Sequence, residues 1–255
     1  MTLGAIFVFP IKSLDGVARH SARITKGGSL EGDREFALFD ETGKVVNGKR
    51  TPRIHQLRTA FSDDLNEVSF REQGQTAGQT FALEDGPELR AWLSAFFGFP
   101  VHLQRDELRG FPDDTDAPGP TLTSEASLHA VGGWFSLPLV ETRRRFRTNL
   151  ELSGNEPFAE DQLFSTAGAL VPFTIGAVSF RGHNPCQRCA VPGRDSLTGE
   201  TTPHFQKTFL RLREDSLPDW SARERFNHFY RFAVNTSIPP EEGGKTLTVG
   251  DPVKL

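Results

Sequence analysis

Short stretches of alternating or mostly apolar residues dominate the first hundred positions of the chain. Residues 3–9 are largely apolar, with β-branched and aromatic members, and Pro10 follows them as it would at the end of a strand. Residues 33–40 alternate polar and apolar side chains before a turn that Gly43 closes. On this pattern we predict strands at residues 3–9, 33–40, 44–47, 57–61, 68–70 and 101–103.

Between Gly86 and Gly98 the hydrophobic pattern changes to the period of a helix. Apolar side chains recur there at spacings of three and four, behind a proline that suits the first helical turn. The spacing predicts an amphipathic helix whose aromatic rings enter a core rather than bind a cofactor. The side chains of this face are Leu89, Trp92, Leu93, Phe96 and Phe97.

The second half of the chain begins after an acidic, proline-rich and aperiodic segment at residues 111–120, which is typical of a linker or long loop. Ser124 and Ser127 then suit the start of a short helix. Further strands are predicted at residues 149–152, 170–180, 208–213, 229–234 and 247–249. Many short strands with two or three helices indicate an α+β fold, mainly β and barrel-like, in two domains at residues 1–115 and 120–255.

The composition of the chain argues against several classes of function. The net charge of -4 gives no basic excess for a nucleic acid partner, and no apolar run approaches the roughly 20 residues of a membrane helix. The first residues lack the basic region of a signal peptide, so we expect a cytoplasmic protein with no membrane partner. No glycine pattern of a Rossmann fold or a P-loop is present.

The only two cysteines, Cys186 and Cys189, form a Cys-x-x-Cys pair in a segment rich in proline and glycine. A thioredoxin-like redox pair is disfavoured, because the residues that follow cannot begin a regular helix in the required way. A structural zinc site is a second interpretation, with His183 and His204 completing four nitrogen and sulfur ligands.

In a third interpretation, a single thiolate binds a metal whose other ligands come with an anionic cofactor. The adjacent Arg188 would favour the thiolate electrostatically. Lys12, Arg34 and Arg147 are cations from distant parts of the chain that suit an anionic cofactor tail. The other cysteine, Cys186, is then expected to be a small buried hydrophobic residue.

Several motifs together resemble one known family. The cysteine segment matches Cys-x-Arg-Cys followed by Asp195, Thr198 and Gly199, and Phe-Pro-Ile-Lys-Ser at residues 9–13 matches an entry motif. Asp-Arg-Glu-Phe at residues 33–36 and Arg-Phe-Arg-Thr-Asn at residues 145–149 follow in order. The chain thereby resembles the MOSC proteins with an N-terminal β-barrel domain, similar to the mitochondrial amidoxime-reducing component and its bacterial YcbX-like relatives.

This resemblance implies an N-terminal β-barrel-like domain, a C-terminal MOSC β-barrel domain with a few helices, and a molybdenum cofactor of the molybdopterin type. By position in the motifs, Cys189 is the metal ligand and a catalytic residue, and Asp195 is a second candidate catalytic residue. Pyridoxal phosphate binding is a further property that the family resemblance brings. The residues implied to contact the cofactor are Lys12, Ser13, Arg34, Arg147, Asn149 and Arg188.

The implied activity is the reduction of a small N-hydroxylated or N-oxygenated compound by oxygen removal at a molybdenum centre. Since the chain has no ferredoxin-like cysteine cluster, the electrons would come from a separate donor, such as a flavin reductase, a ferredoxin or a cytochrome b5-like protein. Two alternatives stay open. In one, Cys189 carries a persulfide in a sulfur-carrier or cofactor-handling protein; in the other, the chain is a zinc-stabilised binding module.

Overall fold

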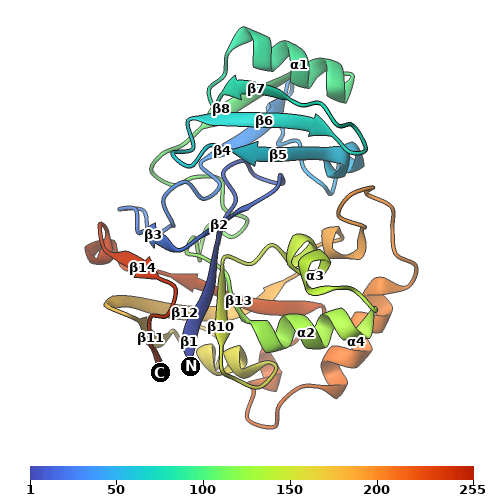
Figure 1. The fold of residues 1–255 in the computed structure, drawn as a ribbon. Helices are drawn as coiled ribbons and strands as arrows, with labels where there is room; N and C mark the ends of the chain where they lie inside the picture. Colours follow the sequence, from blue (N-terminus) through green and yellow to red (C-terminus); the bar gives the residue numbers. More distant parts are fainter.

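The computed structural model describes all 255 residues and divides visibly into two packed parts (Figure 1). The strands are β1 (Thr2–Val8), β2 (Val17–Arg19), β3 (Ser21–Arg23), β4 (Phe36–Asp40), β5 (Leu57–Phe61), β6 (Glu67–Glu72), β7 (Gln79–Ala82), β8 (Val101–Arg105), β9 (Leu122–Ser124), β10 (Leu150–Ser153), β11 (Val171–Ile175), β12 (Val178–Gln187), β13 (Arg231–Ser237), β14 (Thr246–Thr248) and β15 (Val253–Lys254). The α-helices are α1 (Pro87–Phe97), α2 (Glu125–Trp134), α3 (Leu139–Phe146) and α4 (Phe205–Asp215). The 3-10 helices are η1 (Pro52–Gln56), η2 (Ala159–Leu163), η3 (Val191–Gly193), η4 (Arg223–Arg225) and η5 (Pro240–Glu242).

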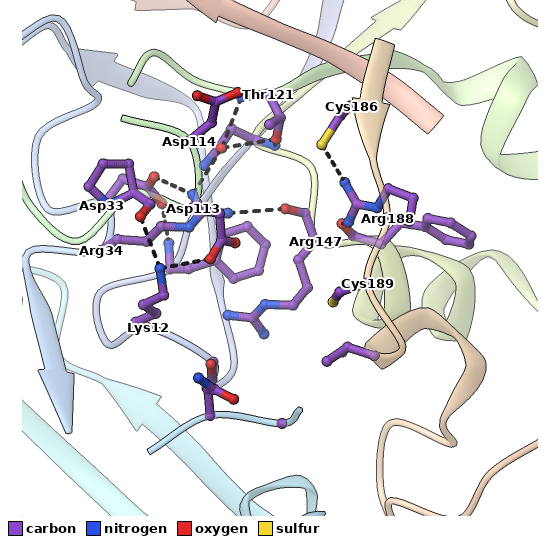
Figure 2. A pocket seen from close by; sticks show the side chains of 18 of the residues that line it. Lys12, Asp33, Arg34, Asp113, Asp114, Thr121, Arg147, Cys186, Arg188 and Cys189 are labelled. Carbon is purple, nitrogen blue, oxygen red and sulfur yellow. Dashed lines mark hydrogen bonds and ion pairs between the residues drawn. The ribbon is translucent and has the colours of Figure 1, made fainter. Parts of the chain in front are cut away.

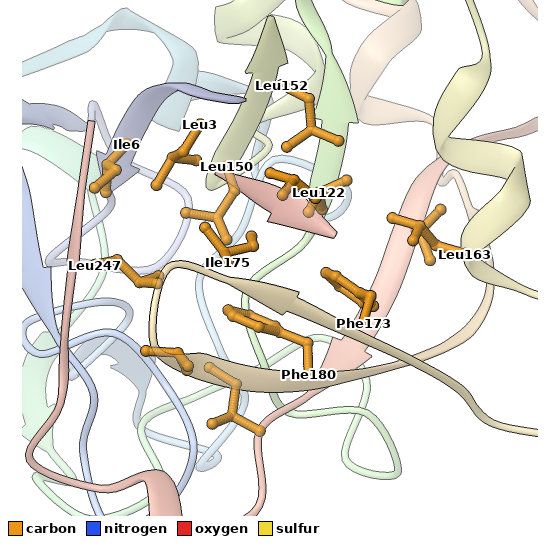
Figure 3. Packing of buried hydrophobic residues seen from close by; sticks show 14 of the residues in the cluster. Leu3, Ile6, Leu122, Leu150, Leu152, Leu163, Phe173, Ile175, Phe180 and Leu247 are labelled. Atoms are coloured by element: carbon orange, nitrogen blue, oxygen red, sulfur yellow. The ribbon is translucent and has the colours of Figure 1, made fainter. Parts of the chain in front are cut away.

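The larger part is built on an eight-stranded sheet in the order β15-β11-β12-β13-β9-β10-β1-β2. Neighbouring strands are antiparallel except β9 and β10, which run parallel. Its core is a cluster of 20 buried apolar residues, among them Leu3, Leu150 and Phe180 (Figure 3). The first strand of the chain is therefore an inner strand of the sheet that the second half builds.

The smaller part holds two small sheets, β5-β6-β7 and β4-β8, with α1 packed against them (Figure 1). Helix α1 begins after Gly86 with Pro87 in its first turn and ends at Gly98, whose φ of 79° is left-handed. Its apolar face enters a core of 17 buried residues, as its spacing predicts.

The predicted fold class, α+β and mainly β, is confirmed. The helix at residues 87–97 is observed, and Ser124 caps α2 by accepting a hydrogen bond of 3.0 Å from the Ser127 amide. The two-domain division at residues 1–115 and 120–255 stays a prediction. Hydrogen bonds between β1 and β10 cross that boundary, since Ile6 pairs with Leu150.

Three predicted strands are wrong in whole or in part. Residues 208–213 lie inside α4, because Phe205, Phe209 and Arg213 are buried at a spacing of four and outweigh the local alternation. Residues 44–47 make only an isolated bridge between Phe39 and Val45. Residues 33–35 precede β4, and Arg34 has a φ of 50°, which no strand accommodates.

Helices α2, α3 and α4 gather beside the large sheet (Figure 1). They pack through aromatic rings, including Phe146, Phe205 and Phe209. No helix of the chain combines the length and the apolar character needed to cross a membrane.

Gly182 in β12 is required by a close approach of η2. A Cβ atom at this position would lie 1.8 Å from the carbonyl oxygen of Leu163, so Gly182→Ala must displace buried backbone. We expect this substitution to lower the unfolding free energy by roughly 2 to 3 kcal/mol, measured by urea denaturation.

Gly133 in α2 offers a matched control, because a Cβ there meets no atom within 4 Å. Gly133→Ala should raise the unfolding free energy by about 0.5 to 1 kcal/mol through the helix preference of alanine. Equal effects at the two positions would contradict the close approach of η2.

Candidate functional site

A cavity of about 680 Å³ lies between the two parts of the molecule. Its walls come from the segment after β1, the segment between β8 and β9, the end of α3 and the turn after β12. Ten Lys or Arg and four Asp side chains line it, although the chain as a whole carries a net charge of -4. A cleft with such an excess of one sign concentrates ligands of the opposite charge, so this cavity favours an anion.

Both cysteines line the cavity. Cys186 lies near the end of β12 rather than in a loop, where a bulge between Pro185 and Gln187 interrupts the pairing with β13. Cys189 follows in the turn before η3, and both side chains are partly exposed. The two thiols are therefore accessible to a ligand that fills the cavity.

Arg188 contacts Cys186 rather than Cys189. Its Nη1 atom donates to the Cys186 sulfur at 3.2 Å, and its Nη2 atom donates to the carbonyl of Phe146 (Figure 2). The prediction that Cys186 is a small buried hydrophobic residue is wrong, because this cysteine is partly exposed and accepts a charged hydrogen bond. The Arg188 cation fixes the first thiol, and Cys189 is left without such a partner.

Arg147 is the residue most clearly prepared for an anion. It ends α3 in the left-handed conformation, with a φ of 52°, and its guanidinium lies 4.3 Å from the centre of the Phe9 ring. The Nη2 atom is buried and has no hydrogen-bond partner. Burial, with nearby Arg34, lowers the pKa of Arg147 to about 10. Arg147 is half-buried, and leaving its buried Nη2 atom without an acceptor costs free energy that a bound anion would offset.

Lys12 follows β1 and Arg34 precedes β4, and each is paired with a carboxylate (Figure 2). Lys12 Nζ lies 2.7 Å from Asp113 Oδ1, and Arg34 bonds to Asp33. Burial lowers the pKa of Lys12, with Asp113 acting in the opposite sense. Burial also acts to lower the pKa of Arg34, but Asp33 and Asp113 outweigh it and raise that pKa.

Asn149 and Ser13 also line the cavity, with different surroundings. Asn149 is 1% exposed; its amide nitrogen donates to the Phe7 carbonyl, and its oxygen accepts from Thr121 and Arg34. Ser13 has a φ of 73° in the turn after β1. The structure thus brings the six predicted cofactor contacts to one cavity, and their contact with a cofactor stays a prediction.

Asp195 lies outside the residues that line the cavity. Its Oδ1 atom accepts from the amides of Leu197 and Thr198 at 3.0 and 2.9 Å. Partial burial acts to raise the pKa of Asp195, but these hydrogen bonds outweigh it, so the pKa is lowered. In this structure Asp195 shapes the loop that ends at Gly199, and its catalytic role stays a prediction.

The predicted zinc ligands do not come together. No group of three or more His, Cys, Asp and Glu side chains that could hold a metal ion is formed. His183 Nε2 pairs with the Ser237 hydroxyl at 2.7 Å, and His204 occupies the left-handed residue before α4. A zinc site made by the chain alone, and with it the zinc-stabilised binding module, is therefore not supported.

Sequence reasoning missed His55 and Arg58, which line the cavity from η1 and the start of β5. Arg58 donates to Asp15 at 3.0 Å and to the Ser196 carbonyl at 3.3 Å, so it ties the cysteine segment to the N-terminal part. His55 packs against Gly199, and its Nε2 atom is buried without a partner. Neither residue belongs to a motif, and only the fold brings them to the cavity.

Comparisons with known proteins agree with the motifs. A family model described as the MOSC N-terminal beta barrel domain matches residues 1–85, and one described as the MOSC domain matches residues 121–254. A molybdenum cofactor sulfurase of Drosophila grimshawi is 27% identical over 282 residues, covering 97% of this chain and 34% of that protein. Those of Caenorhabditis elegans and Danio rerio are each 27% identical, over 84% and 83% of this chain and 31% and 30% of theirs. The chain spans about a third of the length of these relatives.

The environment of His55 predicts an acid-sensitive contribution to stability. Burial, followed by Arg194 and Arg147, lowers the pKa of His55 from 6.5 to about 4. The unfolded state therefore binds a proton more readily, so this contribution is complete above pH 6.5 and is lost as the pH falls toward 4. We expect wild type to lose on the order of 2 kcal/mol more unfolding free energy than His55→Gln between pH 7 and pH 4.

Denaturant unfolding at a series of pH values measures this difference. His129→Gln is the matched control, because that side chain is 60% exposed on α2. The acid-dependent loss assigned to His55 should persist in this variant. Parallel stability curves for wild type and His55→Gln would contradict a buried neutral imidazole at the cavity wall.

Proposed function

Because this chain belongs to the MOSC domain family, we propose that its cavity binds the molybdenum cofactor and that Cys189 holds sulfur for it as a persulfide. The observation that carries the proposal is the Arg147 guanidinium, whose Nη2 atom is buried without a partner, in a cavity that also exposes a free thiol. The relatives are named for action on this cofactor, and the chain matches about a third of each.

The donor set suits a ligand with a phosphate at one end and a soft metal at the other. Figure 2 shows Lys12, Arg34 and Asp113 on one side of the cavity, Cys186 and Cys189 on the other, and Arg147 between them. Guanidinium groups match phosphate oxygens in geometry and charge, and thiolates are suitable ligands for a soft metal such as molybdenum. In this proposal Arg147 and Lys12 hold the phosphate, and the bound cofactor faces Cys189.

Cys189 is the thiol with the freedom to carry sulfur. Cys186 is committed to the Arg188 hydrogen bond, whereas Cys189 makes no side-chain hydrogen bond within the protein. A persulfide on Cys189 would extend into the cavity, where the cations favour its anionic form. The sulfur would come from a separate persulfide donor, which makes this a cofactor-handling function.

The second candidate is the reduction of small N-hydroxylated compounds, with Cys189 as the protein ligand of molybdenum. The observation that favours it is that one chain supplies both the cations and the thiol around a continuous cavity. When bound, the cofactor would supply two-electron oxygen removal, and the protein residues would position it. A separate electron donor is then required as a partner.

Metal and sulfur content separate these proposals. Protein produced in cells that synthesise the molybdenum cofactor should retain molybdenum, and Cys189→Ser should lose it if the thiol is a ligand. If Cys189 is a sulfur carrier, wild type exposed to a cysteine desulfurase and cysteine should release thiocyanate on cyanide treatment, and Cys189→Ser should not. Cys186→Ser is the matched control and should keep the thiocyanate signal.

Reduction of an N-hydroxylated amidine by the molybdenum-loaded protein with an artificial electron donor would establish the second candidate. Protein that takes up neither molybdenum nor sulfane sulfur, while remaining folded, would contradict both. Zinc in place of molybdenum would contradict them as well.

A further inference from the structure

The acidic segment between β8 and β9, residues 106–121, lines the cavity and is called the strap here. It is anchored to the N-terminal part at Phe111, whose amide donates to the Arg34 carbonyl at 2.8 Å and whose ring lies 5.5 Å from that of Phe39. It is anchored to the large sheet at Asp114, whose carboxylate accepts from the Asn235 amide in β13 at 2.9 Å. Residues 111–114 therefore have fixed points on both sides of the cavity.

Asp113 lies between these anchors and pairs with Lys12 (Figure 2). The Lys12 ammonium also donates to the carbonyls of Phe111 and Pro112, at 2.8 and 3.1 Å, so the strap takes up its hydrogen-bonding capacity. Asp113 provides the only carboxylate of the ion pairs that Lys12 makes. The side chain of Lys12 is 14% exposed and that of Asp113 is 74% exposed.

We propose that Asp113 is an internal competitor for the anionic ligand: its carboxylate occupies the position at Lys12 that a ligand phosphate takes, and it sets the affinity and charge selectivity of the cavity. This inference rests on the proposed cofactor-binding function. It assigns to the strap a role in selecting the ligand, in addition to connecting β8 to β9.

The exposure of the two partners makes the exchange feasible. The Asp113 side chain is 74% exposed, so water can solvate its carboxylate when a ligand phosphate takes its place at Lys12. A phosphate monoester carries about 1.5 to 2 negative charges at neutral pH, against one for a carboxylate. In a cavity lined by ten cations, the phosphate therefore displaces Asp113, whereas a ligand with a single carboxylate does not.

The competition does not depend on pH near neutrality. Partial desolvation beside the cavity acts to raise the pKa of Asp113, but Lys12 and Arg34 outweigh it and hold that pKa well below its ordinary value. The carboxylate is charged whenever the protein is folded at neutral pH. Lys12, Arg34 and the more distant Lys49 are the charged groups that act on it.

Calorimetric titration of the full chain with inorganic phosphate, at constant ionic strength, tests the proposal. Asp113→Asn should bind phosphate about three to ten times more tightly than wild type, because a competing charge is removed and the side chain keeps its size. Acetate should bind measurably more tightly to the variant too, since the selectivity against a single carboxylate is lost.

Asp116→Asn is the matched control. Asp116 belongs to the same strap and is exposed, and it does not line the cavity. This variant removes the same net charge and should bind phosphate within about twofold of wild type, as expected for a screened surface charge. Arg147→Gln should weaken phosphate binding both in wild type and in Asp113→Asn. That result would show that the phosphate binds in the cavity.

Equal or weaker phosphate binding by Asp113→Asn would overturn the proposal, because Asp113 would then position Lys12 instead of competing for it. Equal gains in the two aspartate variants would also overturn it, since the effect would be one of net charge. If neither wild type nor any variant binds phosphate, the proposal is also overturned. Molybdenum content of wild type is the separate readout for the proposed function, so the two ideas can fail independently.

Discussion

The buried amide of Asn149 donates a hydrogen bond of 3.0 Å to the Phe7 carbonyl in β1 and accepts hydrogen bonds from Thr121 and Arg34. These partners come from the first strand, the end of the segment that joins the two halves, and the N-terminal wall of the cavity. The bonds to Phe7 and Thr121 hold the amide within the large sheet, and the bond from Arg34 joins it to the segment before β4 on the opposite wall of the cavity. The positions of Arg34 and Arg147 follow from it, since Arg34 Nη2 also reaches the Arg147 carbonyl at 3.4 Å.

The cationic side chains of Arg34, Arg147 and Lys12 repel one another, and carboxylates of the chain neutralise only some of them. Asp33 neutralises Arg34 and Asp113 neutralises Lys12, whereas the Nη2 atom of Arg147 has no partner. Lys12 and Arg34 are therefore paired with carboxylates, whereas Arg147 has none. In the function proposed above, an anionic ligand would supply the missing charge at Arg147, and its affinity would depend on how readily Asp113 leaves Lys12. Ligand binding at Arg147 and the ion pair between Asp113 and Lys12 would then depend on the same group of charges.

Local patterns in the sequence predict the fold class and the motif residues, because turn residues, periodicity and motif spacing are properties of short segments. They also place Lys12, Arg34, Arg147 and Cys189 in one site. They fail where tertiary packing outweighs local alternation, as in α4. They also fail for His55, and for the preference of Arg188 for Cys186, because these contacts depend on how separate segments approach one another. The segment at residues 111–120 was correctly predicted as a connection, but its composition does not reveal the contact between Asp113 and Lys12.

The most direct measurement is a crystal structure of the protein purified with its cofactor, with anomalous scattering recorded at the molybdenum absorption edge. We expect one molybdenum peak in the cavity beside Cys189, with the phosphate of the cofactor at Arg147 and Lys12 and Asp113 displaced from Lys12. A molybdenum peak outside this cavity, or a cofactor phosphate that contacts neither Arg147 nor Lys12, would contradict the assignment of the site.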